Sequence, residues 1–467
     1  MKHQLFFKIW IIVLLVLVMS KMCFSLCGGA INPDANYYIG ASRFLMEGKI
    51  PFLDFQLGYT PLSFYIMCIP LSMFGVSFTT ALAVLYLFHI VNAFWVYKIC
   101  CQYSTNLWLS IFIAVLSLIL ALICDGGSYV LEPFVLFFGL PALYLIKDGS
   151  IKKIVLSGFL CFCAFWCKQY GLGFICLAMV YLCLYHSIGM PLIRKLIYLL
   201  LGFIAGLVVF VVLLWLQGVD PLMMLSLSGN DYQREGIQGF IDAWHTLLII
   251  IPLLVLPIIM VVIGLKDMRK NPLLYISFCG VFGFMLQCYV RFYGHYLILV
   301  MPFCALILFA CVKTFKLLRY RNVFIFLLLF APVIPMYFTT KDIVGLLNSD
   351  GRAIQEQSAH MIEHIIPKGS DDVFASSDML PIALLNSYNP PLEQKYGLSN
   401  GFITNPIEVY EMIQASSYCI ISENRLETSQ FSITARDYLE NEFEMKVLTS
   451  PDSQARYLIY FNKGVGK

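Results

Sequence analysis

The sequence predicts a polytopic α-helical membrane protein that carries a small α/β domain at its C-terminus. Its composition is 60% hydrophobic and 13% charged, with a mean hydropathy of +0.80, which lies well outside the range of soluble globular chains. Apolar runs long enough to cross a bilayer recur along the first 340 residues. Residues 341–467 contain 10 basic and 17 acidic side chains, whereas the first 340 contain 21 and 11. We therefore expect a transmembrane domain over 1–340 and a soluble domain over 341–467.

The apolar runs predict about eleven transmembrane helices. The first run is too long for a signal peptide and lacks a small-residue cleavage site, so we expect it to be retained as a helix. The predicted spans are 5–26, 79–100, 107–124, 131–146, 154–167, 171–186, 196–216, 244–264, 272–289, 296–311 and 322–340.

The charge distribution between these spans predicts their orientation. With the N-terminus in the cytoplasm, fifteen Lys and Arg side chains of the first 340 residues fall inside and six outside, as the positive-inside rule requires. Nine acidic residues fall outside and two inside. We therefore predict a multi-pass protein of the plasma (inner) membrane with an acidic, aromatic outer mouth, a first outer loop over 27–78 and an extracytoplasmic C-terminal domain.

The C-terminal 127 residues show mixed helix and strand patterns. "AIQEQSAHMIEHII" has the helical period, and four short segments, "DDVFAS", "SYCIIS", "FEMKVLT" and "ARYLIYF", are typical of strands. No Gly-rich phosphate loop or nucleic-acid motif occurs here, so no nucleic-acid partner is expected. The domain is expected to cap or support the outer face.

Three ionisable residues stand beside predicted spans, where a charge is costly unless it has a partner or a function. Asp34 follows the first span in "NPDANYY", although Asn-Pro-Asp is also good turn chemistry. Glu132 begins a span, where a carboxylate also suits a helix N-terminus. Lys168, in "FWCKQYGLGF", either snorkels to the interface or faces an anion.

A second group of cations precedes the tenth span. Arg291 and His295, in "RFYGHYLILVMP", would share one face if the helix begins early. Together with Lys168 they predict an outer site where carboxylates and cations meet. Such a site fits a displacement on an anionic lipid-linked donor, in which a base deprotonates an acceptor hydroxyl and cations stabilise the leaving phosphate. The same groups would serve an anion transporter, and their spacing does not choose between the two.

Four ordered segments carry a family resemblance that covers residues 1–340. The chain resembles the multi-span GT-C glycosyltransferases, in the branch of the dolichyl-phosphate-mannose protein mannosyltransferases and bacterial aminoarabinose transferases. The segments are "DANYYIGASRFLMEGKIPFLDFQLGYTPLSFYIMCIPLSMFG", "SYVLEPFVLFFGLPAL", "FWCKQYGLGF" and "RFYGHYLILVMPF". The resemblance implies inverting transfer of a sugar from a polyprenyl-phosphate donor to a cell-surface glycolipid, polysaccharide or protein.

The resemblance also implies roles for residues. Asp34 matches the catalytic acid/base position of the first loop, but Ala35 stands where many relatives have a second acid. Aminoarabinose transferases often have a lysine before a Pro-Leu step, whereas this chain has Tyr59-Thr60-Pro61-Leu62. We therefore assign the donor phosphate to other cations, Lys168, Arg291 and His295.

Secondary roles fall to further residues of the outer mouth. Asp54 and Glu132 are candidates for the acceptor or for a divalent cation, which some relatives use, and Tyr37 and Tyr59 for a sugar-facing wall. The sequence has no dedicated ligand cluster, so no metal or other cofactor is predicted. The predicted partners are membrane lipids, the donor and a glycan, lipid or protein acceptor.

Three alternatives remain open from the sequence. A flippase or transporter of lipid-linked saccharides often has two repeated halves, but no second copy of the first-loop pattern follows residue 200. A polysaccharide polymerase or ligase would use a diphosphate donor. A membrane scaffold without chemistry would leave the outward bias of the acidic residues unexplained.

Overall fold

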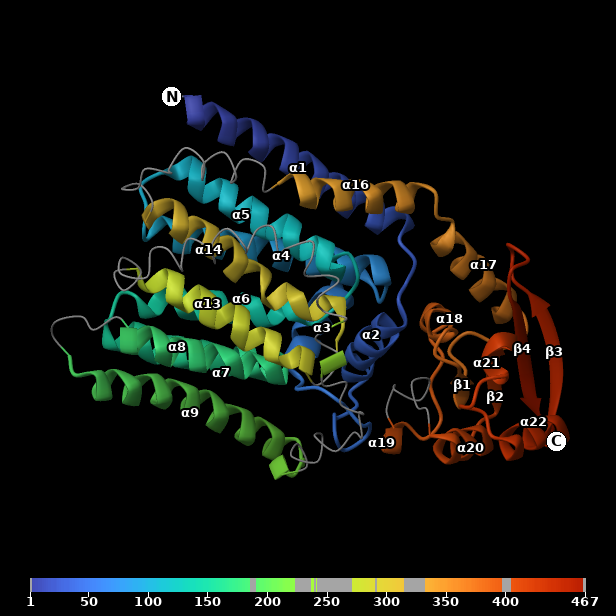
Figure 1. The fold of residues 1–467 in the computed structure, drawn as a ribbon. Coiled ribbons are helices and arrows are strands. Elements are labelled where there is room, and N and C mark those ends of the chain that lie inside the picture. The colour runs from blue at the N-terminus through green and yellow to red at the C-terminus, as the bar shows by residue number, and fades with distance from the viewer. Residues whose placement is uncertain are drawn as a thin grey trace.

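The computed structural model consists of a long helical bundle with an α/β unit at one end (Figure 1). It describes residues 2–184, 190–222, 237–238, 241, 271–289, 292–314, 332–396 and 405–464. The predicted span at 244–264 and the first ten residues of that at 322–340 lie outside the described residues.

The bundle is built from helices that run roughly alongside one another (Figure 1). They are α1 (Lys2–Gly28), α4 (Phe78–Cys101), α5 (Leu107–Ala121), α6 (Glu132–Ile146), α7 (Ile151–Cys167), α8 (Gly173–Leu184), α9 (Leu192–Leu216), α13 (Pro272–Met285), α14 (Met301–Thr314) and α16 (Val333–Leu347). Short 3₁₀ turns cover Gln169–Leu172, Leu286–Tyr289 and Gly294–Leu299.

Nine of the eleven predicted spans coincide with helices in the described part of the chain. Five helical segments there are long and apolar enough to cross a membrane on their own, namely Phe7–Gly28, Phe78–Cys101, Leu107–Gly126, Leu192–Leu216 and Gly294–Val312. Four shorter apolar helical segments are Leu62–Phe74, Glu132–Ile146, Gln169–Leu184 and Pro272–Met285, of which Glu132–Ile146 (α6) is largely buried by its neighbours.

The predicted outer loop over 27–78 contains two helices, α2 (Pro33–Met46) and α3 (Leu62–Phe74). Asn32 caps α2, since its side chain accepts a hydrogen bond from the Ala35 backbone N–H at 2.9 Å. Most of α2 is buried, because it lies between the bundle and the α/β unit (Figure 1).

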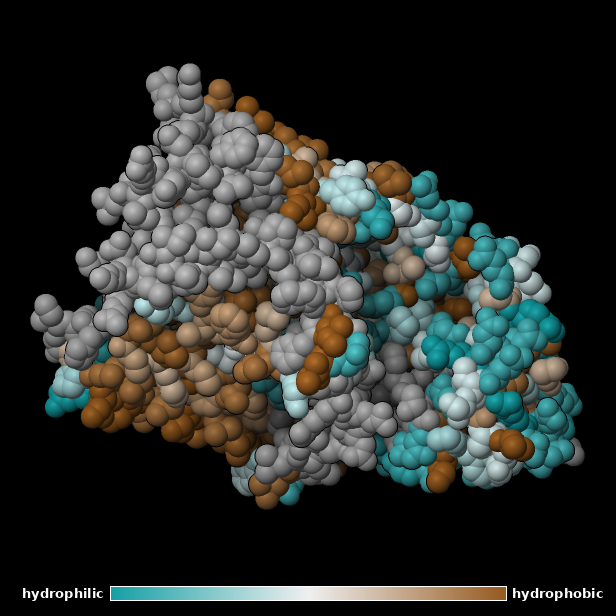
Figure 2. Space-filling view, in the orientation of Figure 1, coloured by the Kyte–Doolittle hydropathy of each residue, from teal (hydrophilic) through white to brown (hydrophobic). Residues whose placement is uncertain are grey.

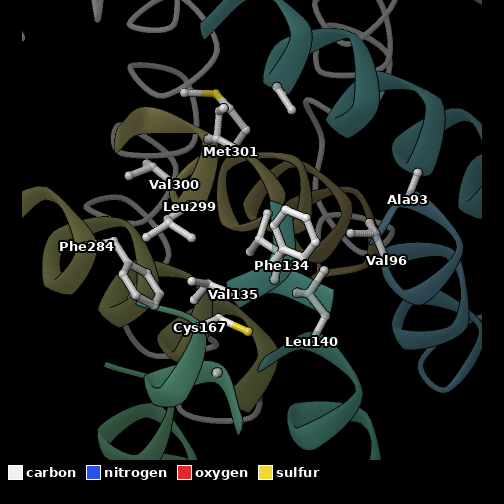
Figure 3. Close-up of a cluster of buried hydrophobic side chains, with 14 of the residues drawn as sticks. Ala93, Val96, Phe134, Val135, Leu140, Cys167, Phe284, Leu299, Val300 and Met301 are labelled. Carbon is white, nitrogen blue, oxygen red and sulfur yellow. The ribbon is translucent and has the colours of Figure 1, made fainter. Parts of the chain in front are cut away.

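Apolar side chains fill the interior of the bundle. In Figure 3, Phe134 and Val135 of α6 lie near Phe284 of α13 and near Leu299, which ends the last 3₁₀ turn. Figure 2 shows hydrophobic residues over the described flank of the bundle and hydrophilic residues over the α/β unit. An apolar flank of this extent suits contact with lipid.

The C-terminal α/β unit is a four-stranded sheet between helices. Strands β1 (Val373–Ala375) and β2 (Tyr418–Ser422) are parallel, and β4 (Arg456–Asn462) lies antiparallel between β2 and β3 (Phe443–Thr449). One face packs on α17 (Gly351–Glu363) and α18 (Leu380–Leu385), and the other on α20 (Pro406–Gln414) and α22 (Ile433–Glu442). Two single-turn helices, α19 (Glu393–Tyr396) and α21 (Glu423–Leu426), complete the unit.

The predicted boundary at 340/341 falls inside α16, which continues to Leu347. The helix continues because Asp342 still lies beside the bundle, where its carboxylate accepts a hydrogen bond from Lys21 Nζ of α1 at 2.5 Å. Beyond it, Arg352 of α17 donates to the Leu26 carbonyl at 2.9 Å and to the Thr79 hydroxyl at 2.7 Å. We call the end of the bundle next to the α/β unit the proximal end and the opposite end the distal end (Figure 1).

Candidate active site

A fully buried ion pair lies at the proximal end. Glu132 is the first residue of α6 and Lys168 directly follows α7, so the antiparallel packing of these two helices brings both residues together. Lys168 Nζ donates to Glu132 Oε1 at 2.5 Å, and the exposed fractions of the side chains are 1% and 0%. Removing two charges from water costs several kcal/mol per ion, which their mutual attraction must offset. Because its ammonium is buried against Glu132 and does not reach the surface, Lys168 does not snorkel.

Aromatic rings surround the Lys168 ammonium. Its Nζ lies 5.3 Å from the ring centroid of Tyr59, 5.6 Å from that of Tyr170 and 4.9 Å from that of Tyr296. These distances are within cation–π range, and the rings come from three separate parts of the chain. The predicted wall residue Tyr59 therefore contacts the predicted phosphate-binding Lys168.

His295 belongs to the same cluster. Its Nε2 lies 4.0 Å from Glu132 Oε1, and its ring stacks on Tyr293 with centroids 5.4 Å apart. The prediction of one helical face for residues 291 and 295 required the helix to begin early. It does not, because Phe292 and Tyr293 are not helical and the 3₁₀ turn begins at Gly294. Arg291 itself lies outside the described residues.

Asp125 lies against the turn that contains His295, a placement that was not predicted. Asp125 has a left-handed φ of 59° inside a π-helical turn, Leu122–Gly126, and its carboxylate lies close to Gly294, the residue before His295. A Cβ on Gly294 would lie 2.4 Å from Asp125 Oδ2, so only glycine allows this approach. The Gly126–Gly127 pair after Asp125 was the one local signal of an irregular turn.

Asp34 lies half-buried in the first turn of α2, beside this cluster. Its carboxylate is within Coulombic range of His295 and of Tyr38. Because Asn32 supplies the cap of α2, Asp34 is not needed for that purpose. The Asp34 carboxylate nevertheless suits the positive end of the helix dipole.

Tyrosines of the first loop form a continuous wall next to Asp34. The ring centroids of Tyr37 and Tyr59 lie 5.8 Å apart, and Tyr38 lies 5.7 Å from each of them. The Gly58 backbone N–H donates to the Tyr37 hydroxyl at 2.5 Å, which fixes the loop against α2. Tyr37 and Tyr59, which were predicted to face the sugar, are therefore in contact with each other.

Asp54 is not part of this cluster. Its carboxylate accepts a hydrogen bond from the Ile50 backbone N–H at 2.6 Å, which closes a turn of the loop. Within the described residues, no group of three His, Cys, Asp or Glu side chains is arranged to hold a metal ion.

Several buried polar atoms near the ion pair have no hydrogen-bond partner among the described residues. They include Glu132 Oε2, the Tyr129 hydroxyl and His89 Nε2. A buried acceptor without a partner costs about 1–3 kcal/mol, and functional sites are common places for this cost. The cluster thus offers a carboxylate with one free oxygen, a fixed ammonium and an imidazole, next to the half-buried carboxylate of Asp34.

Comparisons with solved structures identify the fold. The structure of ArnT from Cupriavidus metallidurans in the apo state superposes with a TM-score of 0.63 at 13% identity, over 97% of this chain and 98% of that one. The same protein bound to undecaprenyl phosphate gives 0.61 at 14% identity, over 98% of each chain. The oligosaccharyltransferase of Archaeoglobus fulgidus in the apo form gives 0.52 at 12% identity, over 97% of this chain and 75% of that one.

The chain therefore has the GT-C fold of a membrane protein, as the sequence analysis expected. No family model and no curated protein matches its sequence.

Proposed function

We propose that this chain is an inverting glycosyltransferase that moves a sugar from a polyprenyl-phosphate donor to a cell-surface acceptor on the outer side of the membrane. The observation that carries the proposal is the convergence of Asp34, the Glu132–Lys168 pair and His295 at one end of a GT-C bundle. The lipid in the second ArnT structure, undecaprenyl phosphate, supports a polyprenyl-phosphate donor. The acceptor is a glycolipid, a polysaccharide or a protein.

In the proposed reaction, the Asp34 carboxylate takes the proton of an acceptor hydroxyl. The hydroxyl oxygen attacks the anomeric carbon from the face opposite the phosphate, and the bond between that carbon and the phosphate oxygen breaks. The bonding electrons leave with polyprenyl phosphate, so the product has inverted configuration. A general base of this kind contributes about 10²–10⁴ to the rate.

The cations stabilise the charge that develops on the leaving phosphate. Lys168 offers a fixed ammonium, one hydrogen bond of which goes to Glu132 Oε1, and His295 lies 4.0 Å from the same oxygen. Arg291, outside the described residues, is proposed for the same role. Glu132 keeps the ammonium in place and offers its second oxygen to the acceptor, while Tyr37 and Tyr59 face the sugar.

Replacing Asp34 by Asn tests the proposal. Purified protein in detergent is given a polyprenyl-phosphate donor with a radiolabelled sugar and a membrane extract, and the label bound to an acceptor is counted. We expect the substitution to lower transfer at least about 10²-fold, because an amide does not accept the proton. Asp220→Asn, an exposed carboxylate after α9 that bonds to the Leu222 backbone, is the control and should keep wild-type transfer.

More than a tenth of wild-type turnover in the Asp34→Asn protein would remove Asp34 from the mechanism. The same assay separates the alternatives. A transporter moves the lipid without attaching label to an acceptor, and a polymerase or ligase requires a donor with two phosphates.

A further inference from the structure

We propose that the C-terminal α/β unit holds helix α2 and the segment after it in position over the Glu132–Lys168 pair, with Arg43, Lys49 and Glu393 as positioning residues. Its effect on turnover rests on the proposed function, but the contacts themselves do not. Besides the contacts of Gln355 with Ile31 and of α18 with α2, the unit binds the first loop through two polar contacts in the stretch from residue 388 to 393.

The first contact fixes α2 itself. Arg43, nine residues after Asp34 on the same helix, is 8% exposed. Its guanidinium donates to the Asn389 side-chain oxygen at 2.6 Å and to the Tyr388 carbonyl at 3.3 Å. Asn389 in turn donates to Asp371 at 2.7 Å. A buried guanidinium without these acceptors would be costly, so α2 and the unit are expected to move together.

The second contact fixes both ends of a short loop. Lys49 Nζ lies 2.8 and 3.0 Å from the two carboxylate oxygens of Glu393, and both side chains are 26% exposed. The backbone carbonyl of Glu393 accepts a hydrogen bond from the Gln56 N–H at 3.1 Å. One residue of the α/β unit therefore binds the beginning and the end of the segment 49–56.

This segment leads directly into the candidate active site. Gly58 donates to the hydroxyl of Tyr37, and its carbonyl accepts a hydrogen bond from Gln169, the residue after Lys168, at 3.5 Å. Tyr59 lies against the Lys168 ammonium. A shift of the loop would thus displace the tyrosine wall, and a displacement of about 1 Å at a reacting centre lowers rates by about 10²-fold.

Leu384 of α18 gives the unit an apolar contact with the bundle, and the Lys49–Glu393 pair lies outside that contact. The sheet of the unit packs within its own two hydrophobic clusters, whereas the loop residues Phe52, Phe55 and Leu57 belong to the core of the bundle. A partly exposed ion pair contributes little to stability. Breaking it should therefore loosen the segment 49–59 while leaving both interiors folded.

The test is Glu393→Lys, which places two ammonium groups together, compared with the charge swap Lys49→Glu/Glu393→Lys. We expect Glu393→Lys to raise amide hydrogen exchange over residues 49–59 and to lower turnover about tenfold, with an unchanged melting temperature. The swap should return the exchange to the wild-type level and turnover to within about threefold. Glu423→Lys, which breaks the exposed Glu423–Arg456 pair, is the matched control and should change neither.

If Glu393→Lys does not fold, Glu393→Gln provides the same comparison without repulsion. Unchanged exchange over 49–59 in the Glu393 variants, or a swap that restores neither measurement, would overturn the proposal. A third outcome separates the two proposals. If Glu393→Lys raises hydrogen exchange over 49–59 and the swap restores it, but the wild-type protein transfers no sugar, the positioning contact is supported and the proposed function is wrong.

Discussion

Lysines at the two ends of the helical bundle have different partners. At the distal end, Lys147 donates to the Gln102 carbonyl and lies 3.7 Å from the centroid of Tyr103, and Lys8 lies 4.5 Å from that of Trp108. These lysines meet neutral partners, as interfacial anchors do. The ion pair at this end between Lys153 and Asp148 is exposed, with side-chain exposed fractions of 45% and 46%.

At the proximal end, buried lysines meet carboxylates. Lys168 pairs with Glu132, and Lys21, which is 5% exposed, pairs with Asp342 and donates to the Leu122 carbonyl at 2.8 Å. A charge held at this cost in a membrane protein marks a function or a structural junction. We therefore propose that the distal end anchors the protein and that the proximal end carries the chemistry.

The largest effect is expected when one partner of the buried Glu132–Lys168 pair is removed. Lys168→Met leaves the Glu132 carboxylate buried without its cation, and we expect a loss of about 3–5 kcal/mol in the free energy of unfolding. Glu132→Gln/Lys168→Met should be more stable than the single variant, because no unpaired charge remains. Thermal unfolding in detergent measures both. A single variant as stable as wild type would show that the pair is not buried as described.

A smaller effect is expected from Gly294→Ala. The added methyl group would lie 2.4 Å from Asp125 Oδ2 and would displace the backbone of His295. Overpacking of this kind costs about 1–3 kcal/mol, and we expect turnover to fall along with the melting temperature. Gly283→Ala is the control, since a Cβ there meets no atom within 4 Å. Equal behaviour of the two variants would contradict the close approach of Asp125 to Gly294.

The smallest effect belongs to the distal end. Lys147→Met removes a hydrogen bond to a carbonyl and a cation–π contact, which together contribute about 1 kcal/mol. We expect a slightly lower melting temperature and unchanged sugar transfer in the radiolabel assay. A large loss of sugar transfer would indicate that the distal end takes part in the reaction, and would contradict the proposed difference between the two ends.

The sequence predicted elements that depend on local pattern. Three strands fall within the segments of strand-like composition and β4 extends one residue past its segment, and nine spans coincide with helices, because period and length are local properties. Asp34, Glu132, Lys168 and His295 stood out because charges beside apolar runs are rare.

The contacts between those residues could not be predicted from the sequence. The Gly126–Gly127 pair indicates an irregular turn but not that Asp125 lies against the Gly294–His295 turn, and nothing local indicates the contact of Lys49 with Glu393, which are 344 residues apart. Helix α3 was missed because its 13 residues are too few for a span. Such features follow from packing, which one sequence does not display.

The pair between Lys21 and Asp342 also has a consequence for the synthesis of the chain. The two residues are 321 positions apart, so the ribosome reaches Asp342 roughly 15–65 s after Lys21 at ordinary elongation rates. During that interval the lysine must rely on water or lipid head groups at the edge of the bilayer. Closure of α1 against α16 is therefore a late event of biogenesis, which cannot precede the insertion of nearly every other helix.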